Sequence, residues 1–257
     1  MENIDLFLSG QKYDLTISPP LMNAAGSLGF FPETTNMGDN PKLGAFVTNP
    51  ISLHARTPAG TRTCLPYPGG FLLHSGYPNP GLQVALRRFR THWARAKLPI
   101  IVHLLVDSTD SANQMAQCFE GIEGVMAIEI GLPPEIDLHS AYELVEAASG
   151  ELPLIVRLPM TRAGEMARAL VGSSLNAISF APPRGMLIDE HGKVVSGRLF
   201  GPAIFPLTLR NTREAIDSGL PVIAGGGVYE EWQVEALLAA GAQAVQLDAV
   251  FWSFNWK

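Results

Sequence analysis

Three consecutive glycines, Gly225, Gly226 and Gly227, follow a short apolar run and precede a helical pattern. Because glycine has no side chain, backbone N–H groups at such a turn can approach a phosphate closely. The positive end of the following helix also favours an anion. A tight turn that binds nothing is the alternative. The pattern therefore predicts either a phosphate-binding turn or a structural one after a strand.

A single charged residue, Arg157, lies in the apolar run at residues 154–158. Burying a guanidinium costs free energy unless an anion or carbonyl groups compensate it. We expect Arg157 either to contact a ligand or to pair with Glu129, which faces the same interior if side chains alternate along the strands. His103, in another apolar run, is expected to be a neutral, hydrogen-bonded core residue.

Eight short apolar runs bounded by turn residues are predicted to be strands, and helical patterns lie between most of them. This alternation predicts a parallel sheet closed as a (β/α)8 barrel, with its site at the carboxyl ends of the strands. No linker divides residues 1–257, so one domain is expected. The predicted strands are residues 21–25, 45–48, 100–106, 125–130, 154–158, 177–180, 222–224 and 244–247, and the predicted helices are residues 82–96, 111–119, 138–148, 162–170, 203–216 and 230–239.

Residues 54–81 are rich in proline and glycine, show no clear periodicity and are long for a connection. Long loops at this face usually cover an active site, so we predict a cover loop. It contains His74 and Tyr77, which are the candidates for proton transfer to or from a ligand. The competing interpretation is that both residues only pack within the loop.

Residues 251–257 form a short aromatic tail in place of a full last helix. Either a partner covers the first and eighth strands, in a homodimer or a hetero-complex, or the aromatic residues fold back as a cap. Of the two, we favour the partner over the cap.

Composition narrows the class of protein. Hydrophobic residues make up 47% of the chain and charged residues 16%, against roughly 25% charged in an average domain, so a large buried core is expected. The net charge of −6 and the absence of a basic cluster argue against nucleic-acid binding. No apolar run reaches the roughly 20 residues of a membrane span, so a soluble, cytoplasmic protein is expected. The cysteines, Cys64 and Cys118, have no metal-ligand spacing, and no metal site is expected.

Five motifs, in order along most of the chain, resemble those of the soluble, FMN-containing dihydroorotate dehydrogenases. They are LMNAAG at residues 21–26, AFVT at 45–48, the segment 69–81 ending in Asn-Pro-Gly, GPAI at 201–204, and the glycine turn with the last strand. The resemblance implies an FMN-dependent oxidoreductase of pyrimidine biosynthesis that transfers a hydride from a small substrate to the flavin. The cofactor-binding positions that it implies are Ala25, Gly26, Asn49, Arg157, Gly201, Gly226, Gly227, Asp248 and Ala249.

The chain also departs from the family pattern at the substrate positions. Asn49 stands where the family has a lysine. The family's fourth strand runs into an asparagine and then the cysteine or serine that acts as general base, whereas this chain has EIGLPP at residues 129–134. Ala181-Pro182 replaces an asparagine followed by threonine or serine. Losing several polar ligands costs a binding site orders of magnitude in recognition, so the substrate need not be dihydroorotate.

A further departure concerns the phosphate. Asp248-Ala249 replaces Gly-Thr, and a carboxylate repels a nearby phosphate by about 1 to 4 kcal/mol. Either Asp248 points away or the phosphate site is lost. Two functions follow from this choice: an FMN-dependent oxidoreductase, or a non-catalytic barrel that has lost flavin and serves as a protein-binding scaffold.

Overall fold

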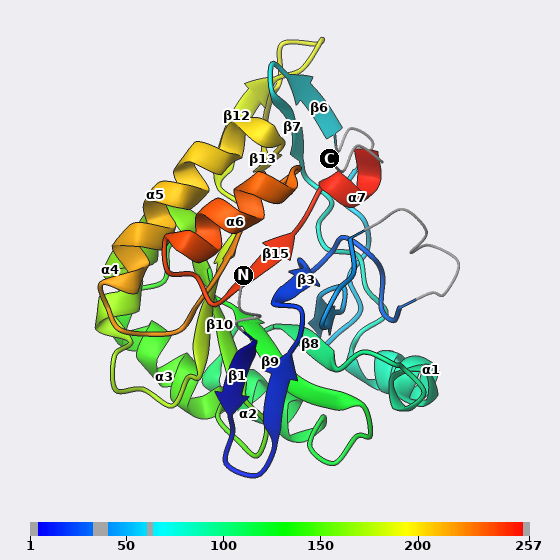
Figure 1. The fold of residues 1–257 in the computed structure, drawn as a ribbon. Helices are drawn as coiled ribbons and strands as arrows, with labels where there is room; N and C mark the ends of the chain where they lie inside the picture. Colours follow the sequence, from blue (N-terminus) through cyan, green and yellow to red (C-terminus); the bar gives the residue numbers. More distant parts are fainter. Residues whose placement is uncertain (1–4, 33–40, 61–63, 254–257) are drawn as a thin grey trace.

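Eight parallel strands form a nearly closed barrel in the computed structural model, which describes residues 5–32, 41–60 and 64–253 (Figure 1). Around the barrel the strands follow their order in the chain, and a short strand β5 (Ile51–Ser52) adds to β8. The predicted (β/α)8 fold is confirmed. The barrel strands are β3 (Leu21–Asn23), β4 (Phe46–Val47), β8 (Ile100–Leu105), β9 (Val125–Gly131), β10 (Leu154–Pro159), β11 (Ala177–Ala181), β14 (Val222–Gly225) and β15 (Ala244–Leu247).

The barrel closes between β3 and β4 through a side chain. The Asn23 amide donates to the Val47 carbonyl (2.7 Å) and accepts from the Val47 N–H (2.9 Å), which reproduces the two hydrogen bonds of a strand pair. One backbone bridge, between Met22 and Ala45, lies beside it. Because Asn23 and Val47 are fully buried, these bonds satisfy backbone groups that water does not reach.

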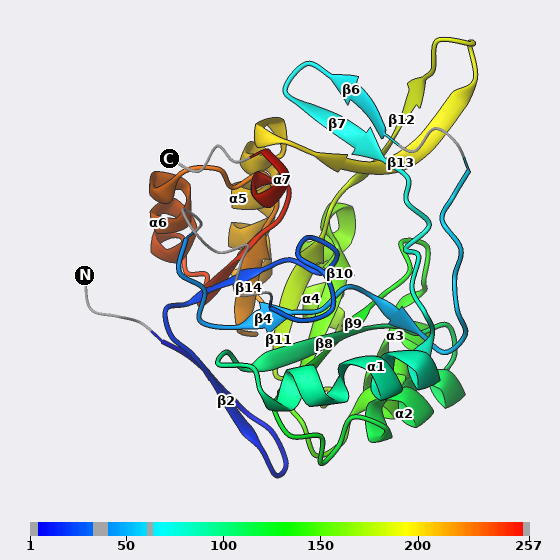
Figure 2. The same cartoon turned by 90° about the vertical axis from the view of Figure 1, so that its right-hand side faces the viewer.

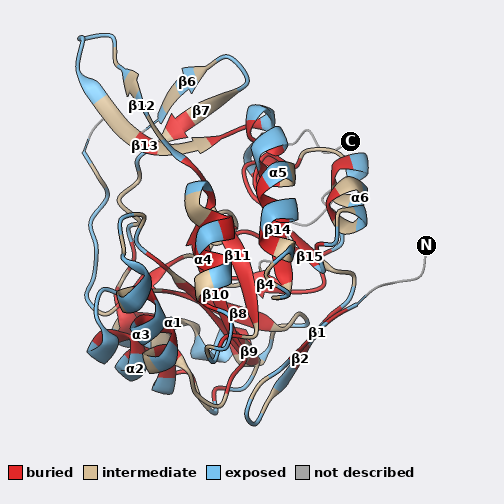
Figure 3. Ribbon diagram, turned by 90° about the vertical axis from the view of Figure 1, so that its left-hand side faces the viewer, coloured by how far each residue is buried: buried red, intermediate tan, exposed pale blue. Residues whose placement is uncertain are grey.

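Six helices pack on the outside of the strands, with their buried faces inward (Figure 3). Each lies where the sequence predicts a helix, but α4 and α5 begin later because their first turns are 3-10 segments, η1 (Met160–Arg162) and η2 (Pro202–Ile204). No helix in the described part of the chain has both the length and the apolarity to cross a membrane. The helices are α1 (Leu82–Ala94), α2 (Thr109–Gln117), α3 (Leu138–Ala148), α4 (Ala163–Ala169), α5 (Phe205–Ile216) and α6 (Glu231–Ala239).

A hairpin of β1 (Leu6–Ser9) and β2 (Asp14–Ile17) covers the amino end of the barrel (Figure 1). Its side chains alternate between buried and exposed, as expected of a hairpin with one face on a core. The buried ones pack with interior residues of the barrel strands, most of which are small or β-branched. The sequence analysis did not predict this hairpin.

A four-stranded antiparallel sheet stands over the carboxyl ends of the barrel strands (Figure 2). Its order is β12 (Arg184–Ile188), β13 (Val194–Phe200), β7 (Gly70–Leu73) and β6 (Cys64–Tyr67), and we call it the lid sheet. Residues 54–81, predicted as a cover loop without clear periodicity, contain a hairpin of β6 and β7. Half of the lid sheet comes from residues 184–200, which no sequence pattern assigned.

The chain after β15 forms only one short helix, α7 (Val250–Ser253), as the predicted shortened last helix requires. Trp252 folds back: its indole N–H donates to the Ser27 carbonyl (2.9 Å), and its ring packs 5.5 Å from that of Phe200. Strands β3 and β15 are buried within the chain, so their expected exposure is wrong. Residues 254–257 of the tail lie outside the described residues, and the partner stays a prediction.

Gly124 provides a test of the packing between α1 and the barrel. A Cβ at Gly124 would collide with the Trp93 carbonyl, and its φ of 85° adds strain for any other residue. We expect Gly124→Ala to lower the free energy of unfolding by about 3 kcal/mol or more. Gly121 has a similar φ of 71°, but nothing lies within 4 Å of its Cβ position, so Gly121→Ala should cost only about 1 to 2 kcal/mol. Urea denaturation followed by circular dichroism compares the two variants, and equal losses would exclude the contact with Trp93 as the cause.

Candidate functional site

A pocket of about 170 Å³ lies between the barrel and the lid sheet. Engineered cavities of roughly 150 Å³ bind benzene, whereas pockets for drug-sized ligands begin near 300 Å³. The pocket therefore has room for one six-membered ring with small substituents. Proline and aromatic side chains, including those of Phe200 and Trp252, form much of its wall. The polar side chains that line it are those of Ser27, Asn49, Ser75, Tyr77, Arg157, Arg198 and Asp248.

The structure brings most of the sequence-predicted site residues to this pocket. The predicted residues that line it are Ala25, Gly26, Asn49, Tyr77, Arg157 and Asp248. Gly226 reaches a small extension of about 10 Å³, whereas Gly201, Gly227 and Ala249 line neither space. His74 is turned toward the lid sheet, where its Nδ1 lies 2.8 Å from the Ser196 carbonyl oxygen. The described residues contain no group of three or more His, Cys, Asp or Glu side chains placed to hold a metal ion.

The end of β15 places the Asp248 carboxylate against the glycine turn. The side chain is buried, and its carboxylate accepts hydrogen bonds from the N–H of Ala249 (2.5 Å) and from the backbone of Gly227. Burial raises the pKa of this carboxyl group, while these bonds and the charge of Arg157 oppose the increase. Backbone donors that the sequence assigns to a phosphate are thus engaged by a side chain of the same protein.

The other side of the glycine turn is also filled. The Cβ position of Gly227 lies 2.5 Å from the Phe205 nitrogen and 2.8 Å from the Gly201 carbonyl oxygen. The Cβ position of Gly226 lies 3.0 Å from both Met160 Cε and Thr208 Oγ1. The start of α5 therefore packs so closely against the turn that neither glycine position accepts a side chain. With the backbone donors of Gly227 and Ala249 bonded to Asp248, the turn does not fit the phosphate of FMN, and a pocket of about 170 Å³ does not fit its three-ring flavin.

Arg157 reaches the pocket from the barrel wall. It is buried, and its Nε donates to the Phe180 carbonyl (3.1 Å). The strand register places Arg157 opposite Gly131, two residues beyond Glu129 along β9. No ion pair joins Arg157 and Glu129, so that interpretation of the sequence is wrong. The role in which Arg157 contacts a ligand stays a prediction.

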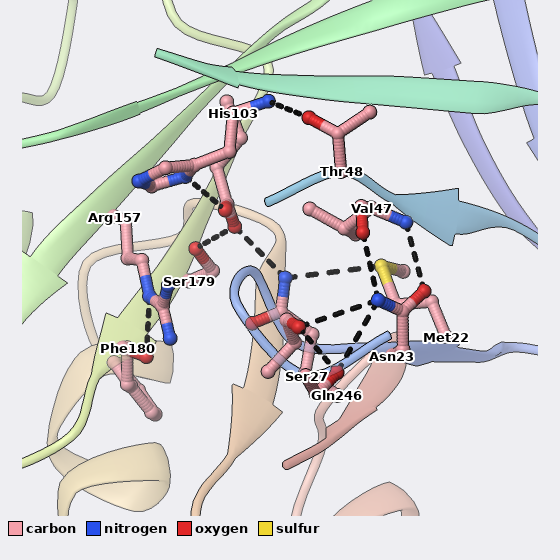
Figure 4. A network of polar contacts seen from close by, with 12 residues as sticks. Met22, Asn23, Ser27, Val47, Thr48, His103, Arg157, Ser179, Phe180 and Gln246 are labelled. Atoms are coloured by element: carbon pink, nitrogen blue, oxygen red, sulfur yellow. Dashed lines mark hydrogen bonds and ion pairs between the residues drawn. The ribbon is translucent and has the colours of Figure 1, made fainter. Parts of the chain in front are cut away.

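Glu129 instead lies at the centre of a buried network in the barrel interior (Figure 4). Its carboxylate accepts from His103 Nδ1 (2.6 Å), from the Ser179 hydroxyl (2.6 Å) and from the Gln246 amide (2.8 Å). The four residues come from β8, β9, β11 and β15, so one carboxylate links four strands. His103 is the buried, hydrogen-bonded residue that the sequence predicts.

The protonation of this network follows from its contacts. Burial acts to raise the pKa of Glu129, but the hydrogen bond and charge of His103, the charge of Arg157 and the hydroxyl of Ser179 together lower it. Burial lowers the pKa of His103, and the bond to Glu129 opposes this. We infer an ionised carboxylate that accepts Nδ1–H from a neutral imidazole. Gln246 Oε1 is buried without a hydrogen-bond partner among the described residues.

The sequence prediction missed Arg198 and Phe200 on β13, and it considered Trp252 only as part of the tail. The Arg198 guanidinium lies 3.9 Å from the centre of the Tyr77 ring. One signal could have found it, because Arg198 is a lone charge in the stretch Gly197-Arg198-Leu199-Phe200 directly before Gly201.

Comparison with known proteins finds relatives along nearly the whole chain. The chain is 30% identical over 254 residues to the dihydroorotate dehydrogenase B (NAD(+)) catalytic subunit of Trichlorobacter lovleyi, covering 91% of this chain and 84% of that protein. The chain belongs to the dihydroorotate dehydrogenase family. Catalytic subunits with the same name from Geotalea uraniireducens (28% identity; 93% and 86% covered) and Desulforamulus reducens (26%; 89% and 82%) are similar to it. No protein-family profile matches the chain.

The departures from the dihydroorotate dehydrogenase pattern have structural counterparts. The Cβ position of Gly131 lies 3.3 Å from Cε1 and Nε2 of His103, so the imidazole fills the space that a side chain at this strand end would take. The Oδ1 of Asn49 accepts the Gly29 N–H (3.1 Å). Pro182, where the resemblance implies a polar residue, forms part of the pocket wall. The site has therefore lost polar groups and gained packing at several positions.

Removing the charge of Glu129 should destabilise the barrel. In Glu129→Gln the donors of His103 and Ser179 lose their ionised acceptor, and each hydrogen bond to a charged group contributes about 1.5 to 3 kcal/mol. Glu143→Gln is the matched control, because Glu143 is exposed and pairs only with His139 on the surface of α3. Its cost should stay below about 1 kcal/mol. Urea denaturation at pH 7 measures both, and equal costs would contradict a structural role for Glu129.

The same network sets the response of stability to acid. In the folded protein the pKa values of Glu129 and His103 both lie below their ordinary values of 4.5 and 6.5. Such groups stabilise the fold above the unfolded pKa, and the contribution is lost as the pH falls below it. We expect the free energy of unfolding to fall as the pH drops below 6.5, and more steeply below 4.5. Because burial and hydrogen bonding leave the folded pKa of Glu129 at about 2, Glu129→Gln should flatten the steeper part in denaturation curves measured between pH 7 and 2, and an unchanged slope would contradict the assignment.

Proposed function

We propose that this member of the dihydroorotate dehydrogenase family binds a small ligand in the pocket beneath the lid sheet and does not hold FMN. The observation that carries the proposal is the Asp248 carboxylate on the backbone donors of Gly227 and Ala249. A cofactor phosphate at this turn would need the same donors. The proposal shares the loss of flavin with the second function inferred from the sequence, the protein-binding scaffold. It differs in that the pocket binds a small molecule.

Electrostatics and volume support the same conclusion. A carboxylate about 4 Å from a phosphate repels each unit of its charge by about 1 to 4 kcal/mol, depending on screening. Engaged donors add the cost of breaking their present hydrogen bonds. The pocket of about 170 Å³ accommodates one ring rather than three. Binding FMN would therefore require Asp248 to turn away and the lid sheet to move.

The second candidate function is an FMN-dependent oxidoreductase, with a substrate that need not be dihydroorotate. Two observations favour it: the chain belongs to this family, and Arg157 presents a positive charge to the pocket. A permanent positive charge beside a flavin favours its anionic reduced form. Tyr77 lines the same pocket and is the predicted residue placed for proton transfer, whereas His74 contacts the lid backbone.

A protein partner remains part of the proposal. The relatives are named catalytic subunits, which supports assembly of this chain with a second subunit or a second copy. The tail is the predicted surface for that contact. Phe251 is buried, whereas the side chain of Trp252 packs on Phe200 and stays 40% exposed, so Trp252 is available to a partner.

Asp248→Gly tests the proposal directly. Removing the carboxylate frees the N–H groups of Gly227 and Ala249 and removes the repulsion, so FMN affinity should rise by about tenfold or more. The wild-type protein, expressed with excess riboflavin, should be colourless. Titration of FMN with each protein, followed by the quenching of FMN fluorescence, compares the FMN affinity of the wild type with that of the variant.

Asp248→Asn is the matched control, because it keeps the size of the side chain and removes its charge. An intermediate gain in Asp248→Asn would separate charge repulsion from occupied space. Stoichiometric FMN released from the wild-type protein on denaturation would overturn the proposal and establish the oxidoreductase alternative.

A further inference from the structure

Arg198 brings a second guanidinium to the pocket, from the side opposite Arg157. It lies on β13 of the lid sheet, where it is paired with Leu73 on one side and Arg184 on the other. Both Arg157, from the barrel wall, and Arg198, from the lid sheet, line the same cavity. A ligand in that cavity would lie between two positive charges on separate parts of the fold.

No acidic side chain balances the charge of Arg198 among the described residues. It forms no ion pair there and donates no side-chain hydrogen bond. Burial lowers its pKa, and the neighbouring charges of Arg157, Arg184 and Arg56 lower it further. Asp248 lines the same pocket, but its carboxylate is held by backbone groups at the glycine turn. A partly buried cation surrounded by cations is costly unless an anion joins it.

The contact that does hold Arg198 is built on a strained residue. Its guanidinium lies over the ring of Tyr77, whose φ of 53° is the only positive φ at a non-glycine residue in the described chain. The amide of Asn79 holds the Tyr77 carbonyl (2.9 Å), and the Oδ1 of Asn79 accepts from the backbone of Ser52 (3.2 Å) on β5. Strain of this kind persists only where the surroundings fix it, and it concentrates at ligand sites.

We propose that Arg198 is a specificity-determining residue: its guanidinium, stacked on Tyr77 and facing Arg157 across the pocket, binds the anionic group of a small one-ring ligand. This inference rests on the proposed function, because it names the class of ligand for the same pocket. The guanidinium fork matches a carboxylate in two hydrogen bonds. The volume of about 170 Å³ limits the rest of the ligand to one ring, which packs against Phe200 and the prolines of the wall.

Benzoate and benzamide form a matched pair of probes, because they share the ring and differ in charge. Isothermal titration calorimetry to concentrations on the order of 10 mM detects dissociation constants near 1 mM. We expect benzoate to bind the full-length protein about tenfold more tightly than benzamide, as a charge-assisted hydrogen bond predicts. Arg198→Gln should abolish the difference between the probes, and Arg198→Lys should retain part of it.

Arg184→Gln is the control, because this substitution also removes a positive charge near Arg198, but from an exposed residue that does not line the pocket. It should leave the preference for benzoate within about twofold of the wild type, as expected for screened surface charge. Circular dichroism verifies that each variant is folded. If Arg198→Gln does not fold, Arg198→Lys carries the test: a preference for benzoate below that of the wild type supports the proposal, and an unchanged preference overturns it.

The outcomes separate this inference from the proposed function. FMN content is measured on the same preparation, and stoichiometric FMN overturns the proposed function, whatever the probes do. Equal binding of both probes, no binding of either, or an unchanged preference in folded Arg198→Gln overturns the anion site, while the absence of FMN leaves the proposed function standing.

Discussion

The rest of the structure depends on one buried carboxylate. Glu129 lies in the barrel interior, where an ionised group is stable only if donors replace its lost water. His103, Ser179 and Gln246 supply those donors from three other strands, so the charge holds β8, β9, β11 and β15 in one register. Pro182 and Asp248, directly after β11 and β15, line the pocket. The requirement to satisfy Glu129 therefore constrains the site above it, although Glu129 itself does not line that site.

The second buried carboxylate, Asp248, is satisfied in a different way. Its hydrogen bonds come from the backbone at the end of β15 and at the glycine turn. Arg157 donates its Nε to a carbonyl, and Arg198 stacks on an aromatic ring. Among the described residues neither guanidinium forms an ion pair, although the charge of Arg157 also acts on Glu129 and Asp248. Two guanidinium groups without an ion-pair partner beside one pocket are the electrostatic basis for an anionic ligand.

The sequence predicted the barrel because each barrel strand is a short apolar run, and buried parallel strands have that pattern. It did not predict the lid sheet, because β12 and β13 are only partly buried and β6 contains Pro66, so neither a continuous apolar run nor strand propensity marked them. Arg198 was missed for the same reason. The pairing of Arg157 with Glu129 failed on register: alternation puts both side chains inside the barrel, but only the structure shows that Arg157 lies level with Gly131 and Glu129 with His103.

Asp248 shows where sequence reasoning about a binding site ends. The sequence shows that an aspartate replaces the glycine of the family pattern at this position. It also gives the two alternatives: the side chain points away from the phosphate, or the phosphate site is lost. Choosing between them depends on whether the Gly227 N–H is free, which is a property of the fold around Gly201 and Phe205 rather than of the local sequence. Phe71, Phe200 and Trp252 pack together beside the pocket. Under the proposed function, the small size of the pocket and the loss of the phosphate site are two results of the same substitution, and the site suits a small anionic ligand with one ring.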